Sequence, residues 1–171
     1  RGSRTHANVD VATLTEGPHR GRGECVPYAR YGETVEGVMA DIERLKADIE
    51  RGLDRAGLQA AMPAGAARNA LDCAFWDLEA KRGNTTAAAL AGLGPLVASV
   101  TAFTISLGTP EKMAADTAKA KHRPLLKIKL GGDGDEERIA AVRAAAPDAR
   151  LIVDANEAWS EALFARNMEA C

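Results

Sequence analysis

A regular alternation of strand-like and helix-like segments begins at Val97 and limits the fold of this chain more than any other feature. The strand-like segments are VASVTAFTISL, LLKIKL and RLIVDAN, and helix-like segments follow them from Pro110, from DEERIAAV and from about Ser160. Strands that recur at near-equal spacing with a helix between them are typical of a parallel sheet with right-handed crossovers. The continuous apolar run Leu151–Val153 fits a buried parallel strand. The second half of the chain is therefore predicted to have an α/β fold.

Periodicity alone does not separate an open, doubly wound sheet from a closed β/α barrel. The loop after LLKIKL offers one clue, because it contains Gly131, Gly132 and Gly134 in the order GGDGD. A dinucleotide-binding sheet carries the fingerprint GxGxxG at this place, where glycines permit a tight turn and close approach of a pyrophosphate. The order GGDGD does not match it, which argues against a dinucleotide-binding fold.

The first half of the chain has a different pattern, which predicts a hairpin followed by two helices. Residues 9–28 are interpreted as two strands around the turn-like sequence EGPHRGRGE. Apolar residues recur every three to four positions over Val35–Leu53 and predict a helix, with Thr34 as its N-cap. A second predicted helix, AARNALDCAFWDLEAKR, ends before a glycine.

A segment with two glycines and a proline, Gly92–Pro95, predicts the boundary between two domains. We expect a small α+β domain over residues 1–95 and a β/α domain over residues 96–171. A chain of 171 residues is long enough to bury a hydrophobic core.

The charge balance and the cysteines exclude several classes of partner and compartment. Lys and Arg (22) do not exceed Asp and Glu (24), so no basic excess favours nucleic acid. No apolar run approaches the roughly 20 residues that a membrane helix needs, and the polar opening RGSRTHANVD predicts no secretory leader. The three cysteines form no CxxC motif or Cys/His cluster, which suits a reducing compartment. We therefore expect a cytoplasmic protein that binds neither nucleic acid nor a membrane.

Two lysines inside one predicted strand are the most informative candidates for chemistry. Lys127 and Lys129 stand two apart in LKIKL, so their side chains share one face of the strand. If Ile128 packs against helices, both ammonium groups point into the middle of the sheet or barrel. A second cation and the loss of water each lower the pKa of a lysine, which lets it act as a base near neutral pH. The structural alternative is an edge strand with two solvated lysines.

Polar side chains on the neighbouring strands add to this pair. Asp154 stands at the C-terminal end of the predicted apolar strand Leu151–Val153. In a barrel, the C-terminal ends of the strands hold the active site. A carboxylate there can bind Mg²⁺, and Asn156 adds a polar group on the same side. The alternative is that Asp154 only caps the following turn. Thr104, one strand before the lysines, can hydrogen-bond a substrate or simply be a residue that favours strands.

Longer stretches of the sequence resemble a known family. The segments are ARNALDCAFWDLEAKRG, TAFTISLGTPEKMA, LLKIKLGGDGDEERI and LIVDANEAW, and they are similar to the muconate-lactonizing subgroup of the enolase superfamily. The K-x-K strand followed by V-D-A-N is specific to the subgroup, and TISLGTPEKM narrows the resemblance to the dipeptide epimerases of the L-Ala-D/L-Glu type. RGSRT and GRGECVPYARYGET resemble the capping domain of that family.

The resemblance implies an α/β protein in which an α+β capping domain is followed by a TIM-type β/α barrel. Residues 96–171 would be the first three βα units of that barrel, with the remainder absent from this chain. The implied reaction is the Mg²⁺-dependent epimerisation of a dipeptide. A base removes the α-proton and the metal stabilises the enediolate, as is general for enolase-superfamily sites.

The resemblance also implies a role for each matching residue. Lys129 would be the acid/base on one face of the substrate carbon, and Lys127 would contact the substrate carboxylate and lower the pKa of its neighbour. Asp154 would be the first metal ligand, and Thr104 would bind substrate. Arg1–Thr5 would belong to a cap loop that closes over the substrate.

The resemblance leaves other functions open. N-acylamino acid racemases, o-succinylbenzoate synthases and cycloisomerases of the same superfamily share the K-x-K and D-A-N features. Because the chain ends at Cys171, in the helix after the third predicted barrel strand, we expect the other metal ligands and the second acid/base to lie outside it. A hypothesis of another class is an inactive, truncated fragment that associates with other chains. The preferred dipeptide and the oligomeric state stay open, and a homo-oligomer is one alternative.

Overall fold

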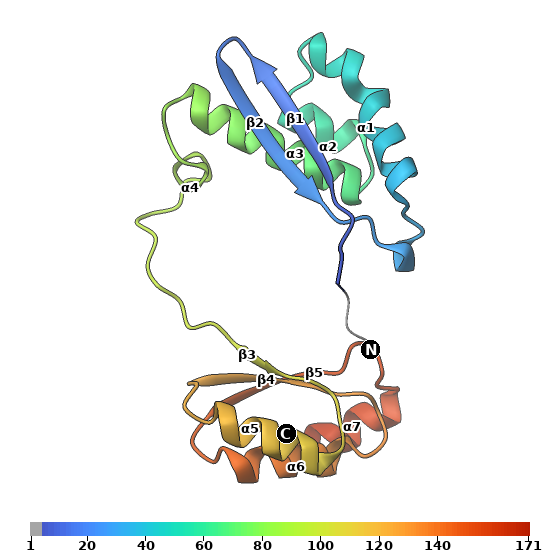
Figure 1. Ribbon diagram of the computed structural model, residues 1–171, viewed down its shortest axis with the longest axis vertical. Helices are drawn as coiled ribbons and strands as arrows, with labels where there is room; N and C mark the ends of the chain where they lie inside the picture. Colours follow the sequence, from blue (N-terminus) through green and yellow to red (C-terminus); the bar gives the residue numbers. More distant parts are fainter. Residues whose placement is uncertain (1–4) are drawn as a thin grey trace. The chain divides into compact units, whose positions relative to one another are not determined.

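In the computed structural model, which describes residues 5–171, the chain divides between Leu96 and Val97 into two units (Figure 1). The first unit contains strands β1 (Asp10–Glu16) and β2 (His19–Cys25), the 3-10 helix η1 (Ala29–Tyr31), and helices α1 (Val35–Glu50), α2 (Arg55–Ala61), α3 (Ala66–Arg82) and α4 (Ala87–Leu90). The second contains strands β3 (Phe103–Ile105), β4 (Leu125–Lys129) and β5 (Arg150–Asp154), and helices α5 (Pro110–Ala120), α6 (Asp135–Ala145) and α7 (Glu161–Ala170). Among the residues described, no helix is both long and apolar enough to cross a membrane.

The first unit is built on helix α3, along which the antiparallel β1–β2 hairpin lies (Figure 1). The apolar face of this helix is buried as the spacing predicts, through Ala67, Ala70, Leu71, Ala74, Phe75 and Leu78. Helix α1 adds Val38 and Leu45 to the same core. The predicted N-cap of α1 is confirmed, because the hydroxyl of Thr34 accepts a hydrogen bond from the N–H of Gly37 at 3.0 Å.

The glycine-rich segment EGPHRGRGE is mostly strand, so its interpretation as a long turn is wrong. Glu16 pairs directly with His19, which leaves only two residues for the turn. Gly21 and Gly23 lie in β2 against α3. A Cβ at Gly21 would lie 2.2 Å from the carbonyl oxygen of Ala74, and one at Gly23 would lie 2.0 Å from that of Ala70. These glycines are needed for close approach of strand to helix and not for a turn.

Two helix boundaries also differ from the sequence-based expectation. Helix α1 ends at Glu50 and not at Leu53, because Gly52 takes a φ of 104°. Leu53 still packs against the core of this unit. Helix α2 was not predicted, since a helix of seven residues, about two turns, is too short for its apolar spacing to be detected. Its N-cap is Asp54, which accepts from the N–H of Gly57 at 2.7 Å.

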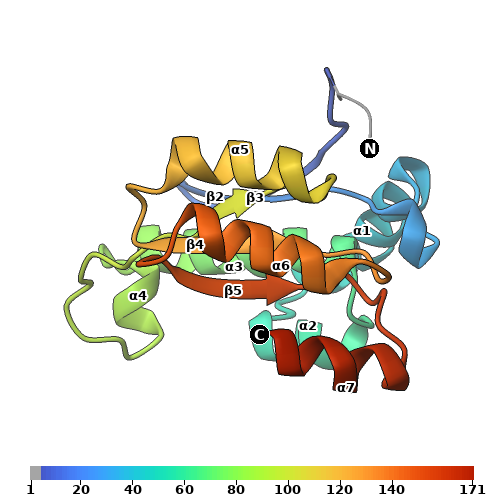
Figure 2. The ribbon, with the colours of Figure 1, turned by 90° about the horizontal axis from the view of Figure 1, so that it is seen from below.

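The second unit is a parallel sheet in the order β3-β4-β5, which confirms the alternation seen in the sequence. Helices α5 and α6 lie against one face of this sheet (Figures 1 and 2). Ile105, Leu126 and Ile128 are fully buried in the core on that side. The described residues form an open sheet, and they do not close a barrel.

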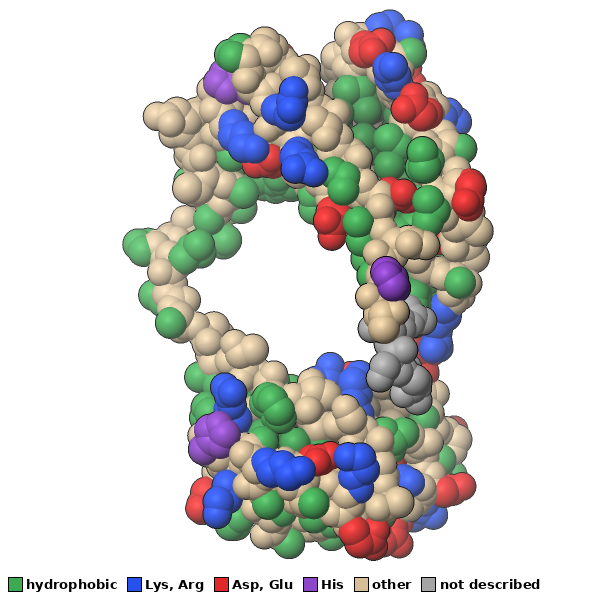
Figure 3. Space-filling view, in the orientation of Figure 1, with side chains coloured by type: hydrophobic (Ala, Val, Ile, Leu, Met, Phe, Trp, Pro, Cys, Tyr) green, Lys and Arg blue, Asp and Glu red, His purple; other side chains and the backbone are tan. Residues whose placement is uncertain are grey.

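The first strand of this unit is shorter than the apolar run that predicts it. Residues 97–102 have no partner strand within the part of the chain that is described, and pairing with β4 begins only at Phe103. Val97 is 85% exposed and Val100 is 57% exposed, and hydrophobic side chains are visible along this connecting segment in Figure 3. Apolar, β-branched residues favour strands, but a strand forms only where a neighbour accepts and donates its backbone hydrogen bonds.

Candidate active site

The candidate residues project from the sheet face that α5 and α6 leave uncovered. On β4 the side chains of Leu126 and Ile128 are buried against the helices, so Lys127 and Lys129 point the other way. Thr104 of β3 pairs in register with Lys127 and is exposed on the same face. The prediction that both lysines of K-x-K share one face of the strand is therefore confirmed.

The strand register brings a carboxylate to both lysines. Asp154, the last residue of β5, pairs with Lys129. The Nζ atoms of Lys127 and Lys129 each lie 2.7 Å from Asp154 Oδ2. The three side chains are partly exposed, at 35% for Lys127 and 26% for each of the other two. Two cations and one anion thus form a compact, water-accessible cluster at the C-terminal end of the sheet.

This cluster shifts the ionisation of the carboxyl group. Hydrogen bonds from Lys127, then from Lys129, then from the backbone N–H of Asn156 hold the pKa of Asp154 well below its ordinary value. Asp154 is therefore an anion throughout the neutral range. An anionic oxygen at this place is a suitable ligand for a hard cation.

The backbone directly after Asp154 is held in a conformation that few residues adopt. Asn156 and Glu157 have φ values of 49° and 64°, in the left-handed region that costs roughly 1–3 kcal/mol for a non-glycine residue. The N–H of Asn156 donates to Asp154 Oδ1 at 3.0 Å, and its side-chain Oδ1 accepts from Lys129 Nζ at 2.9 Å. Asn156 therefore ties the carboxylate and the lysine to one turn.

The donor set at the strand ends fits Mg²⁺ only in part. Asp154 offers an anionic carboxylate, and Mg²⁺ is commonly held by one or two carboxylates together with water and substrate oxygens. Within residues 5–171, however, no group of three or more His, Cys, Asp or Glu side chains is placed to hold a metal ion. Asp154 is thus chemically suited to be one ligand, and the described residues do not assemble a complete set.

The two structural alternatives for these residues have different outcomes. The edge-strand alternative for the lysines is wrong, because β4 lies between β3 and β5. The turn-capping alternative for Asp154 describes one of its contacts, since it accepts from the N–H of Asn156, but the carboxylate also pairs with both lysines. Of the expected cap-loop residues Arg1–Thr5, the first four lie outside the residues that the structure describes, and Thr5 is exposed.

One residue close to this cluster was not singled out from the sequence. Asp135 begins α6 and its side chain is fully buried, which is rare for a carboxylate. It accepts a hydrogen bond from the indole N–H of Trp159 at 2.8 Å. The sequence offers only a weak signal, because acidic residues are common in the first turn of any helix. A contact with a residue on the next loop has no local signature.

Comparisons with known proteins show the family to which the chain belongs. Residues 1–92 match the family described as mandelate racemase / muconate lactonizing enzyme, N-terminal domain. The chain belongs to this family. Alignments with individual relatives cover 94% to 98% of the chain, so both of its units are matched.

Proteins of known function that are similar to this chain include epimerases and a racemase. The chain is 50% identical over 169 residues to the L-Ala-D/L-Glu epimerase of Escherichia coli (strain K12). The alignment covers 97% of this chain and 53% of that protein. The chain is 37% identical to the N-acetyl-D-glutamate racemase of a Pseudoalteromonas species, with 94% of this chain and 51% of that protein covered. The chain therefore spans about half the length of the relatives that it matches.

Solved structures similar to this chain include enolase-family proteins with dipeptides bound. An enolase family member from Agrobacterium tumefaciens with homology to dipeptide epimerases, bound to sodium and L-Ala-L-Glu, is 53% identical with a TM-score of 0.89. The superposition covers 98% of this chain and 52% of the Agrobacterium protein. The dipeptide epimerase of Cytophaga hutchinsonii, complexed with Mg and D-Ala-L-Val, is 28% identical with a TM-score of 0.82, and the shares covered are 97% and 49%.

Proposed function

We propose that the complete protein containing this chain is a Mg²⁺-dependent epimerase of dipeptides of the L-Ala-D/L-Glu type. The observation that carries the proposal is the convergence of Lys127, Lys129 and Asp154 on one exposed sheet face. The 50% identity to an L-Ala-D/L-Glu epimerase supports the choice of substrate. In this proposal residues 1–95 form the capping domain and residues 96–171 the first three βα units of a barrel.

The proposed chemistry assigns one task to each side chain. Lys129, the lysine nearer the C-terminal end of β4, takes the α-proton of the substrate and returns it on one face. Lys127 binds the substrate carboxylate through its ammonium group, and the hydroxyl of Thr104, beside it in register, donates to the substrate. Asp154 contributes one anionic ligand to the metal. When bound, Mg²⁺ stabilises the negative charge that develops on the carboxylate oxygens as the α-proton leaves.

Proton removal next to a carboxylate explains why these groups are needed together. The α-proton of such a substrate is very weakly acidic, and a base alone does not remove it at a useful rate. Positive groups aimed at the carboxylate lower the barrier because they act where charge develops. The site on β4 and β5 supplies one base, one carboxylate-binding cation and one metal ligand, and the remaining groups would come from the rest of the complete protein.

The function is tested by deuterium incorporation. The complete protein, purified with Mg²⁺, is incubated in D₂O with L-Ala-L-Glu or L-Ala-D-Glu, and the α-proton of the glutamate residue is followed by ¹H NMR. We expect loss of the α-proton signal from both epimers, abolished by a chelator and restored by Mg²⁺. A metal-replete, folded protein that exchanges neither epimer would contradict the proposal.

A second candidate substrate is an N-acylated glutamate. The observation in its favour is the 37% identity to an N-acetyl-D-glutamate racemase. The same assay with N-acetyl-L-glutamate separates the two, because the preferred substrate has the higher kcat/KM. In either case Lys127 would face the carboxylate next to the α-carbon.

We also propose that the protein is cytoplasmic and that its partner is a small molecule and not a nucleic acid. Cys25, Cys73 and Cys171 are free thiols, which supports a reducing compartment such as the cytoplasm. Acidic and basic side chains both occur on the face of the second unit that Figure 3 shows, so this face has no basic stripe of the kind that binds nucleic acid. The proposed partner is a small-molecule substrate.

A further inference from the structure

The buried carboxylate of Asp135 is surrounded by hydrogen-bond donors from two different loops. It accepts from the N–H of Gly131, at 3.1 Å to each oxygen, and from the N–H of Gly132 at 2.8 Å. The indole N–H of Trp159 donates to Oδ2 at 2.8 Å, and Nη1 of Arg138 donates to Oδ1 at the same distance. One side chain therefore joins the loop after β4 to the loop after β5.

These are the loops that follow the candidate active-site residues. Gly131 stands two positions after Lys129, and Trp159 lies in the segment between Asp154 and helix α7. The backbone connects them as well, because the N–H of Leu130 donates to the carbonyl oxygen of Asp154 at 3.0 Å. A shift of the loop after β4 would reach Lys129 over two residues, and a shift at Trp159 would reach Asp154 over five.

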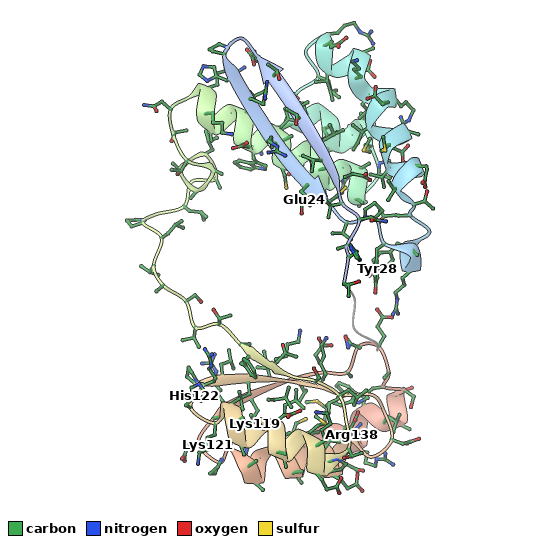
Figure 4. All side chains as sticks on the ribbon, in the orientation of Figure 1. Glu24, Tyr28, Lys119, Lys121, His122 and Arg138 are labelled. Atoms are coloured by element: carbon green, nitrogen blue, oxygen red, sulfur yellow. The ribbon has the colours of Figure 1, made fainter. Side chains whose placement is uncertain are left out.

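Arg138 extends the network to the third loop. Its Nε donates to the carbonyl oxygen of Gly108, between β3 and α5, at 3.0 Å, and its Nη1 donates to that of Asp133 at 2.8 Å. In Figure 4, Arg138 lies at the other end of this unit from Lys121 and His122, which precede β4. The network thus occupies the end of the sheet at which the three strands finish.

The charge of Asp135 is kept in spite of its burial. Burial raises the pKa of this carboxyl group, but the hydrogen bonds from Trp159, Gly132, Gly131 and Arg138 outweigh the effect, and the pKa lies below its ordinary value. A buried anion is costly unless its donors are well placed. Removing the carboxylate would leave those donors without an acceptor, so the loops would have to rearrange.

We infer that Asp135 is a positioning residue which, with Arg138, joins the loops after β3, β4 and β5 and so fixes Lys129 and Asp154 relative to each other. The inference rests on the proposed function, and it adds a residue that touches neither substrate nor metal. Outer groups that orient metal-binding side chains commonly contribute about tenfold to a hundredfold to affinity or activity, and we expect an effect of this order for Asp135.

The first test is Asp135→Asn in the complete protein, assayed by α-proton exchange in D₂O. Asn keeps the size of the side chain but loses its charge and turns an amide N–H₂ toward the donors. We expect kcat to fall about tenfold to a hundredfold while KM changes by less than about threefold, because the substrate-binding groups remain. A purely structural role would instead lower the amount of folded enzyme without this split between kcat and KM.

The matched control is Asp148→Asn, the same substitution at an exposed side chain between α6 and β5, away from the three loops that follow the strands. It should leave kcat at the wild-type value. A folded Asp135→Asn protein with wild-type kcat would overturn the inference, and so would an equal loss in the Asp148→Asn control.

A milder variant serves if Asp135→Asn does not fold. Trp159→Phe keeps an aromatic ring and removes only the N–H donor to Asp135. Loss of one such hydrogen bond should lower kcat by about two- to tenfold. Unchanged kcat in a folded Trp159→Phe protein would count against the network.

A readout that is independent of catalysis separates this inference from the proposed function. In ¹H–¹⁵N spectra of the complete protein, the assigned indole N–H signal of Trp159 should shift and exchange faster with solvent in Asp135→Asn, while that of Trp76 stays unchanged. An inactive wild-type protein would contradict the proposed function alone, and the indole signal would still decide whether Asp135 joins the loops. An indole signal unchanged by Asp135→Asn would overturn the inference.

Discussion

Lys129 and Asp154 are neighbours twice over, because they are register partners across the β4–β5 ladder and their side chains meet at 2.7 Å. Parallel pairing sets the first relationship, and the turn after Asp154 sets the second by placing Asn156 Oδ1 2.9 Å from the same ammonium group. The strand register and the turn after Asp154 thus bring the proposed acid/base and the proposed metal ligand together.

The ion pairs of Asp154 predict how stability depends on pH. Because the two lysines hold the pKa of Asp154 below its ordinary value of about 3.9, the unfolded chain takes up a proton before the folded chain as the pH falls. The stabilising contribution is therefore complete above about pH 4 and is lost below it. At about pH 6 the wild-type protein should unfold at a higher urea concentration than Asp154→Asn does, and this difference between the urea midpoints should be smaller at about pH 3.

This unfolding is followed through the fluorescence of Trp159, which reports on the second unit. Trp76→Phe in both proteins removes the signal of the second tryptophan within residues 1–171. A stability difference that is the same at both pH values would show that the charge of Asp154 does not contribute in this way.

Lys127 is predicted to act mainly in substrate binding. In Lys127→Met the apolar stem remains and the ammonium group that would meet the substrate carboxylate is lost. Because a hydrogen bond to a charged group contributes about 1.5–3 kcal/mol, KM for L-Ala-L-Glu should rise by at least about tenfold. Steady-state kinetics of the complete protein measure this, with Lys119→Met, 78% exposed on α5, as the control. A variant with the wild-type KM would remove Lys127 from the binding site.

Gly23 is predicted to be essential for packing of the first unit. In Gly23→Ala the new Cβ would lie 2.0 Å from the carbonyl oxygen of Ala70 in α3, so strand and helix must separate. Overpacking of this kind costs typically about 1–3 kcal/mol, and urea unfolding followed through Trp76 measures the loss. Gly94→Ala is the control, since nothing lies within 4 Å of a Cβ there. Equal stability of the two variants would contradict the account of the hairpin.

The parallel sheet could be predicted from the sequence because its signal is repeated. Three strand-like runs alternate with helix-like segments, and the order β3-β4-β5 follows that alternation. The ends of the strands and helices could be predicted less well from the sequence. Gly21 and Gly23 have the composition of a turn, and only the position of α3 shows that they are packing residues. The length of β3 is limited by its partner, which no local pattern reveals.

The same distinction applies to the site. The period of two in K-x-K predicts that both lysines share a face, and the end of the apolar strand predicts the place of Asp154. Asp135 could not be identified in this way, because what distinguishes it is a contact with Trp159 on another loop. Residues that act by joining loops become visible only once the loops are placed.

The most direct test of the central claim is α-proton exchange by Lys129→Ala in the complete protein, measured separately on L-Ala-L-Glu and L-Ala-D-Glu in D₂O. Since Lys129 is proposed to serve one face of the substrate carbon, the variant should lose exchange from one epimer. Lys119→Ala, an exposed lysine on α5, should exchange both. Loss from one epimer is the result that this account predicts, and exchange from both epimers at the wild-type rate would contradict it.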